Sequence, residues 1–156
     1  MPWTIATSLA GLVEALNTDI AREVVAADRC LRLARLVQQL HNPALCRQVA
    51  VGAAAALSNA TALAVEVMAL GGTPSASLRP GPRAIPAARS VEEHLIDVRA
   101  ELAHYRGRLL LSRRLGLERL QEVFRKIVRS KRKLLAHAGG IASAIVMRTR
   151  TLGEIE

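Results

Sequence analysis

The sequence is poor in aromatic residues, with one Trp, one Tyr and one Phe among 156 residues. β-Sandwiches and β-barrels rely on aromatic and β-branched side chains, so an all-β fold is disfavoured. Cysteine is also scarce. Cys30 and Cys46 have no close Cys or His at zinc-site spacing, and two thiols do not make a disulfide framework in a chain of this length. This composition favours a reducing compartment, and we expect a cytoplasmic protein.

The N-terminal 16 residues lack a basic start, and Glu14 interrupts the stretch that an exported protein would keep uncharged. We therefore expect no signal peptide. Residues 48–65 carry no charge, which raises the alternative of a membrane span. Gly52, Ser58, Asn59 and the many alanines weaken that alternative, so we expect no transmembrane segment.

Apolar residues are abundant, at 51% of the chain, and Ala, Leu, Val and Arg dominate. This content excludes global disorder and predicts one domain, residues 1–156, with a sizeable core. Apolar residues recur at helical spacing in four stretches. These predicted helices cover about residues 8–40, 44–70, 90–115 and 117–138. The fold class is therefore predicted to be all-α.

Proline and glycine mark the ends of these helices. Residues 71–89 contain four prolines and three glycines, which predicts an irregular crossover between the second and third helices. Ser90 and Glu93 have the spacing of a capping box and predict the start of the third helix. Gly139-Gly140 predicts the end of the fourth helix, before a short C-terminal apolar segment, residues 141–147. This order is expected of a four-helix bundle with a single long crossover.

Three stretches stand out on the predicted helices and at their ends: residues 16–23 (LNTDIARE), 69–74 (ALGGTP) and 91–95 (VEEHL). Together they resemble bacterioferritin-like proteins. The resemblance covers most of residues 9–138 and implies a ferritin-like bundle. It also implies a di-iron site in the core, built from one Glu on the first helix, one Glu on the third, and Glu-x-x-His on the second and fourth.

Most of the implied iron ligands are absent. The residues at the six implied positions are Glu23, Ala56, Asn59, Val98, Lys131 and Leu134. Glu23 is the only carboxylate. The inward register of the third helix favours Val98 at its ligand position, with Glu101 as the alternative. Leu57 stands where haem-binding members place a methionine, so no haem is expected.

Lys131 would repel a metal ion, because a di-iron centre needs anionic oxygen and neutral nitrogen donors. We therefore expect no cofactor, no catalytic residues and no ferroxidase activity. Burying either charge alone is costly, so Glu23 and Lys131 are predicted to pair in the former metal site. Glu23 as a partly solvated helix residue is one alternative. A residual iron site from Glu23, Glu101 and His104 is another, because Glu101 and His104 have Glu-x-x-His spacing.

The net charge of +9 comes from one segment. Residues 99–133 hold 12 basic and 3 acidic residues, whereas the flanking segments are neutral. The apolar stripe occupies the other face of these helices, so the basic residues, Arg108 and Arg119 among them, should mostly point outward. The residues that we expect to face a polyanion are Arg106, Arg113, Arg114, Arg125, Lys126, Arg129, Arg132 and Lys133. An ordinary solvated face is the alternative interpretation.

These observations predict a non-catalytic, oligomeric, structural or partner-binding protein. The apolar content exceeds what such a bundle must bury alone, so we expect at least a homodimer. An intact ferritin-like paralogue or an acidic protein surface are the other partners considered. Two alternatives stay open: an iron-storage or ferroxidase protein with a non-standard metal site, and a basic ferritin relative that binds nucleic acid through its phosphates, without base stacking.

Overall fold

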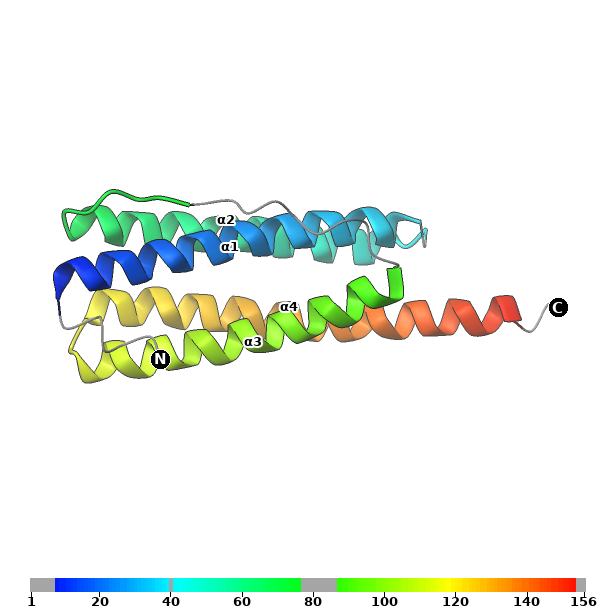
Figure 1. The fold of residues 1–156 in the computed structure, drawn as a ribbon. Helices are drawn as coiled ribbons and strands as arrows, with labels where there is room; N and C mark the ends of the chain where they lie inside the picture. The colour runs from blue at the N-terminus through cyan, green and yellow to red at the C-terminus, as the bar shows by residue number, and fades with distance from the viewer. Residues whose placement is uncertain (1–7, 40, 77–86, 154–156) are drawn as a thin grey trace.

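In the computed structural model the described residues are 8–39, 41–76 and 87–153. They form four α-helices and no strand (Figure 1). The helices are α1 (Leu9–Gln38), α2 (Pro43–Ala69), α3 (Ala87–Arg114) and α4 (Glu118–Gly153). The predicted all-α, four-helix fold is confirmed for this part of the chain. Most of the predicted crossover, residues 77–86, lies outside the described residues.

Local sequence signals set most of the helix ends. The Ser8 side chain accepts a hydrogen bond from Gly11 N at 3.1 Å and caps α1. Asn42 caps α2 in the same way, with a proline in the first turn. Gly71, at φ 77°, ends α2, and Gly116, at φ 67°, separates α3 from α4.

Two predicted boundaries are wrong. α3 begins at Ala87, so Ser90 lies inside the helix and is not its N-cap; the alanines before it are strong helix formers. α4 continues through Gly139-Gly140 to Gly153, so residues 141–147, predicted to be a separate segment, belong to this helix. Ala138 and Ile141 are buried on either side of the two glycines, and this packing outweighs the roughly 1 kcal/mol that each glycine costs a helix.

The helices form two stacked antiparallel pairs, α1 with α2 and α3 with α4 (Figure 1). Asn17 near the start of α1 donates to the Thr73 carbonyl just after α2, at 3.0 Å. Ser112 near the end of α3 accepts from Gln121 near the start of α4, at 3.4 Å. α1 and α4 therefore run in one direction, and α2 and α3 in the other.

The bundle core has two apolar clusters separated by a polar layer. One cluster includes Leu16, Leu63 and Phe124, and the other includes Cys30, Val49 and Ile141. On each helix, the residues between the two clusters include polar or alanine side chains that are fully buried. This middle layer holds the buried charges of Glu23, Glu101 and Lys131.

Within the described ranges, α2 is the one helix that is long and apolar enough to cross a membrane, judged by length and composition alone. Of its most apolar 18-residue stretch, 44% is buried inside the bundle. The core helix of a soluble bundle passes the same test, so the expectation that the chain has no transmembrane segment stays a prediction.

Candidate functional site

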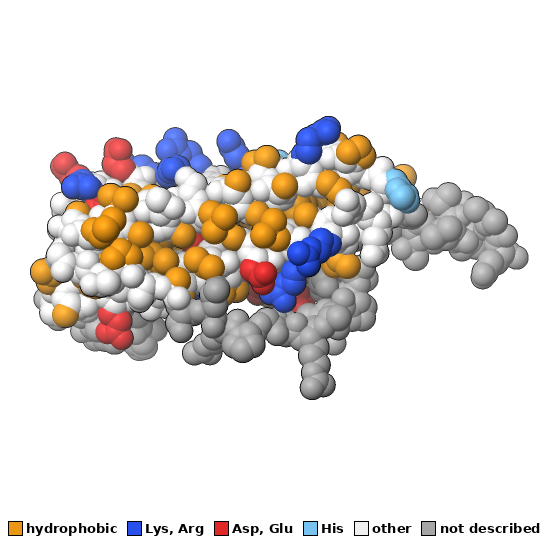
Figure 2. All heavy atoms as spheres, turned by 90° about the horizontal axis from the view of Figure 1, so that it is seen from above, with side chains coloured by type: hydrophobic (Ala, Val, Ile, Leu, Met, Phe, Trp, Pro, Cys, Tyr) orange, Lys and Arg blue, Asp and Glu red, His pale blue; other side chains and the backbone are white. Residues whose placement is uncertain are grey.

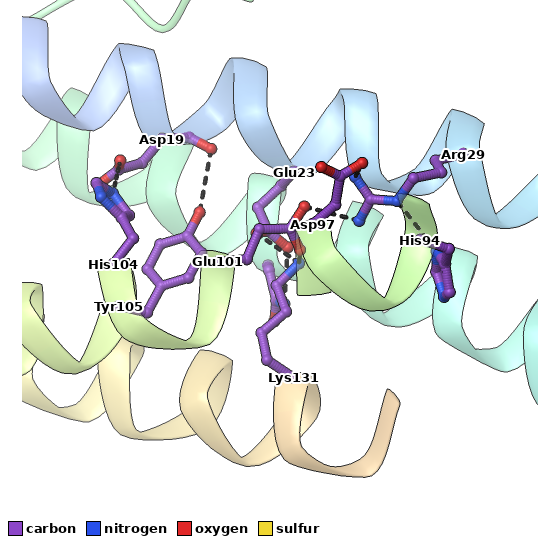
Figure 3. Close-up of polar contacts among 10 residues, drawn as sticks. Asp19, Glu23, Arg29, His94, Asp97, Glu101, His104, Tyr105 and Lys131 are labelled. Carbon is purple, nitrogen blue, oxygen red and sulfur yellow. Dashed lines mark hydrogen bonds and ion pairs between the residues drawn. The ribbon is translucent and has the colours of Figure 1, made fainter. Parts of the chain in front are cut away.

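Side chains from three helices meet in the polar layer around Lys131 (Figure 3). Lys131 Nζ of α4 lies 2.8 Å from Glu23 Oε1 of α1 and 2.9 Å from Glu101 Oε2 of α3. The exposed fraction is 1% for Lys131 and zero for Glu23. One ammonium group is therefore shared by two carboxylates in the core, and the two residues expected to pair, Glu23 and Lys131, are in contact.

α2 and the Tyr105 ring complete the surroundings of the ammonium group. Asn59 Nδ2 donates to Glu23 Oε2 at 3.0 Å, so the second carboxylate oxygen also has a partner. Lys131 Nζ lies 5.9 Å from the centroid of the Tyr105 ring, within cation–π distance. Glu23 Oε1 and Glu101 Oε2 make no well-aligned hydrogen bond, so their stabilisation comes from the charge of Lys131.

Arg29 of α1 supplies a second cation on the other side of Glu101. Its Nη2 lies 2.7 Å from Glu101 Oε1, and its Nη1 lies 3.5 Å from Asp97 Oδ2 at the surface. Arg29 Nε donates to His94 Nδ1 at 3.1 Å. Two buried carboxylates are thus balanced by two cations, which keeps the layer close to neutral.

The electrostatics of this layer favour one protonation state. Burial raises the pKa of Glu101, but Lys131 and Arg29 outweigh burial and lower it overall, so Glu101 stays ionised. Burial, reinforced by Arg29, lowers the pKa of His94 to about 4. His94 is therefore neutral at pH 7 and carries its proton on Nε2, because Nδ1 accepts from Arg29. Burial and the charges of nearby carboxylates raise the pKa of Tyr105 well above its ordinary value.

A second buried cluster surrounds Asp19 of α1. Arg108 Nε lies 2.7 Å from Asp19 Oδ2, and His104 Nε2 lies 2.7 Å from Asp19 Oδ1. The expectation that Arg108 points outward is wrong, because a fully buried Asp19 needs a cation and Arg108, 3% exposed, provides it. The sequence did contain a signal that Arg108 is buried. Arg108 follows Glu101 by seven residues, so the two side chains lie on the same side of α3.

The implied metal-ligand positions do not form a metal site. Ala56 packs against alanines of α1, and Val98 and Leu134 belong to an apolar cluster. Val98 is fully buried, as its inward register predicts, whereas Glu101 faces Glu23 across Lys131 and is held there by two cations.

Of the residual set, Glu23 and Glu101 meet at Lys131, whereas His104 bonds to Asp19 in the second cluster. Within the described residues no group of three or more His, Cys, Asp or Glu side chains is placed to hold a metal ion. The carboxylates nearest the implied di-iron position are already neutralised by Lys131 and Arg29. The residues present therefore do not fit a di-iron centre.

The outer surface divides into two kinds of face. All eight residues expected to face a polyanion are exposed, on α3 and α4. Large apolar side chains are exposed mainly on α1 and α2, where they form a band along the bundle (Figure 2). The members of this apolar face are Leu9, Val25, Leu31, Val51, Leu57, Val65 and Met68.

Comparisons with protein-family models, curated proteins and solved structures found no match to this chain. The expected relationship to bacterioferritin-like proteins therefore stays a prediction.

Proposed function

We propose that this chain is a ferritin-like bundle in which an internal ammonium group has taken the place of the metal, and that it acts as a non-catalytic, oligomeric, structural or partner-binding protein. The observation that carries the proposal is the position of Lys131 Nζ, 2.8 Å and 2.9 Å from carboxylate oxygens on two other helices. A metal bridging these helices would hold the same carboxylates, so Lys131 can supply the cross-link without redox chemistry.

The direction of the helices supports the ferritin-like part of the proposal. α2 and α3 run the same way, which supports a connection that returns along the bundle between Ala69 and Ala87. α2, with 27 residues, is about 40 Å long at 1.5 Å per residue. Residues 70–86 span up to about 55 Å when extended, so this connection can reach the far end of the bundle. One such long crossover is typical of ferritin-like bundles.

The donor set gives less support to the iron-oxidase alternative. Lys131 offers a positive charge where a metal would need an anionic or neutral donor. The side chain of Leu134 has no donor atom at all. His104 is engaged with Asp19. A ferroxidase would need these side chains to rearrange and Lys131 to leave the layer.

The apolar face on α1 and α2 supports assembly with a second copy of the chain. Val51, Leu57, Val65 and Met68 of α2 are 44–62% exposed, and α2 carries no charged residue between Arg47 and Glu66. Two copies related by a two-fold axis could bring the α2 parts of these faces together without opposing like charges. The proposed oligomer is therefore a homodimer through this face, and an intact paralogue with a similar face could replace one copy.

Light scattering and an iron oxidation assay on the same protein test the proposal. We expect a dimer mass for the wild type and a monomer mass for Leu57→Glu, which puts a charge in the apolar face. Leu110→Glu is the matched control, because Leu110 is exposed to a similar extent on α3, and it should stay dimeric. Ferrous iron should oxidise no faster with the protein than in buffer. A monomeric wild type would contradict the homodimer, and rapid iron oxidation would contradict the non-catalytic assignment.

A further inference from the structure

The outer face of α4 carries only charged side chains over four turns. Every exposed residue from Glu118 to Lys133 is charged, and six of the eight are basic. The six are Arg119, Arg125, Lys126, Arg129, Arg132 and Lys133. Arg119 reaches Glu66 of α2, and Arg125 lies beside Gln121 on the side of α3, so the basic surface extends across the whole outer side of α4.

α3 adds a parallel row of arginines beside α4. Arg99, Arg106 and Arg113 are exposed and follow one another at intervals of seven residues, so they share one side of the helix. His104 and Arg108 point from α3 toward α1, and helix geometry places the arginine row on the opposite flank, next to α4. The basic face is defined here as these three arginines together with the six basic residues of α4.

This basic face has few internal counter-charges. Within the described residues, Arg106, Arg129 and Arg132 have no ion pair, and the exposed acids in the same part of α4 are Glu118 and Glu122. Glu122 lies 3.7 Å from Arg125. Like charges held this close on a rigid helix pair repel one another, and an external polyanion would relieve the repulsion.

The chemistry of the face favours nucleic acid over a protein or a membrane. Protein interfaces have an apolar, charge-depleted centre, and peripheral membrane helices insert apolar side chains beside their charges. The exposed residues of α4 between Glu118 and Lys133 offer no apolar side chain for either purpose, and the arginine row of α3 adds one large exposed apolar side chain, Leu110. Phosphate binding needs only positioned cations, and arginine matches a phosphate group with two parallel donors.

The form of nucleic acid follows from the aromatic residues. Single-strand binding usually depends on exposed aromatic rings that stack on bases. Tyr105 and Phe124 are both buried, and Trp3 precedes the described residues. The row from Arg99 to Arg113 is about 21 Å long at 1.5 Å per residue, and a B-form duplex presents about a dozen phosphates over that length.

We propose that the basic face of α3 and α4 binds double-stranded nucleic acid through its phosphates, without reading the base sequence. This inference does not depend on the proposal that Lys131 replaces a metal, or on the proposed homodimer. If the face contacts four to six phosphates, a plot of the logarithm of the binding constant against the logarithm of the salt concentration should have a slope of about −4 to −5.

Fluorescence anisotropy with a labelled 30-base-pair duplex tests this inference at several salt concentrations. The variant Arg106→Gln, Arg129→Gln and Arg132→Gln removes three charges from the basic face. Its matched control, Arg22→Gln, Arg35→Gln and Arg47→Gln, removes three exposed charges from α1 and α2 and gives the same net charge. We expect the first variant to bind at least about tenfold more weakly at 100 mM salt and to reduce the slope by about 3, while the control stays near the wild type. Duplexes of scrambled sequence should bind equally well.

Four results would overturn the inference. The first is that the wild type does not bind the duplex at 50 mM salt, and the second is that both triple variants bind the duplex equally weakly. The third is tighter binding to phosphatidylserine vesicles than to the duplex, and the fourth is binding to polyglutamate that is as tight as binding to the duplex. The first would leave the face as an ordinary solvated surface. The second would assign binding to net charge alone, and the others would assign the face to a membrane or to an acidic protein.

Discussion

Removal of the Lys131 charge is the substitution that the buried layer should tolerate least. Lys131→Met keeps the side-chain length and deletes the ammonium group. Glu23 then keeps its neutral partners, Asn59 and the nearby Tyr105, and has lost its cation, whereas Glu101 keeps Arg29. Loss of one member of a buried ion pair costs about 3–5 kcal/mol, because the other charge remains buried without compensation. For a chain of this length, that corresponds to a fall in Tm of about 6–20 °C.

A double-mutant cycle shows whether Glu23 is the partner responsible. Glu23→Gln leaves Lys131 paired with Glu101 at 2.9 Å, so its cost should be smaller, about 1–2 kcal/mol. The double variant removes both charges and should recover most of the stability lost in Lys131→Met. Urea unfolding at pH 7 gives the free energy of each variant, and we expect a coupling of at least about 2 kcal/mol. Additive effects, or a neutral Lys131→Met, would refute the reasoning.

Three further predictions follow from other buried features. The pKa of His94 is about 4 in the folded protein and 6.5 ordinarily. Between pH 4 and pH 6.5, His94 is therefore protonated in the unfolded chain and neutral in the folded protein. The free energy of unfolding should therefore fall as the pH drops from 6.5 to 4, by up to about 3 kcal/mol, and His94→Gln should flatten that part of a pH series of urea melts. Arg108→Gln should cost about 3 kcal/mol, because Asp19 is fully buried, whereas Arg119→Gln, at a pair whose arginine is 70% exposed, should cost under about 1 kcal/mol in the same melts. Gly72→Ala should destabilise by about 1–3 kcal/mol, since its Cβ would lie 2.6 Å from a Val13 methyl carbon. Gly107→Ala, in open space within α3, should raise Tm instead, and equal effects of the two alanines would contradict this assignment.

The helices were predictable because apolar spacing and capping residues are local signals. The predicted ends at about Leu40, Leu70 and Leu115 lie within one or two residues of the observed ends at Gln38, Ala69 and Arg114. The error at Gly139-Gly140 arose because tertiary burial of Ala138 and Ile141 overrides the local effect of glycine. Burial of this kind depends on neighbouring helices, which periodicity along one helix does not report.

The candidate site was predictable only in part. The contact between Glu23 and Lys131 follows from two opposite charges at inward positions. The contributions of Arg29 and His94 depend on how α1 and α3 are aligned, and a sequence alone does not fix that register. A signal was nevertheless present, because His94, Glu101 and Arg108 recur every seven residues and therefore lie on one side of α3. Polar residues at an inward spacing indicate a buried network and not only an exposed face.

The central claim is that an ammonium group stands where a metal would bind. The most direct measurement is the iron content of the purified protein after incubation with ferrous iron under anaerobic conditions and removal of free metal. The account predicts less than about 0.1 iron per chain, because Lys131 and Arg29 already neutralise the carboxylates. About two irons per chain would contradict it, since both ions would have to displace Lys131 from Glu23 and Glu101.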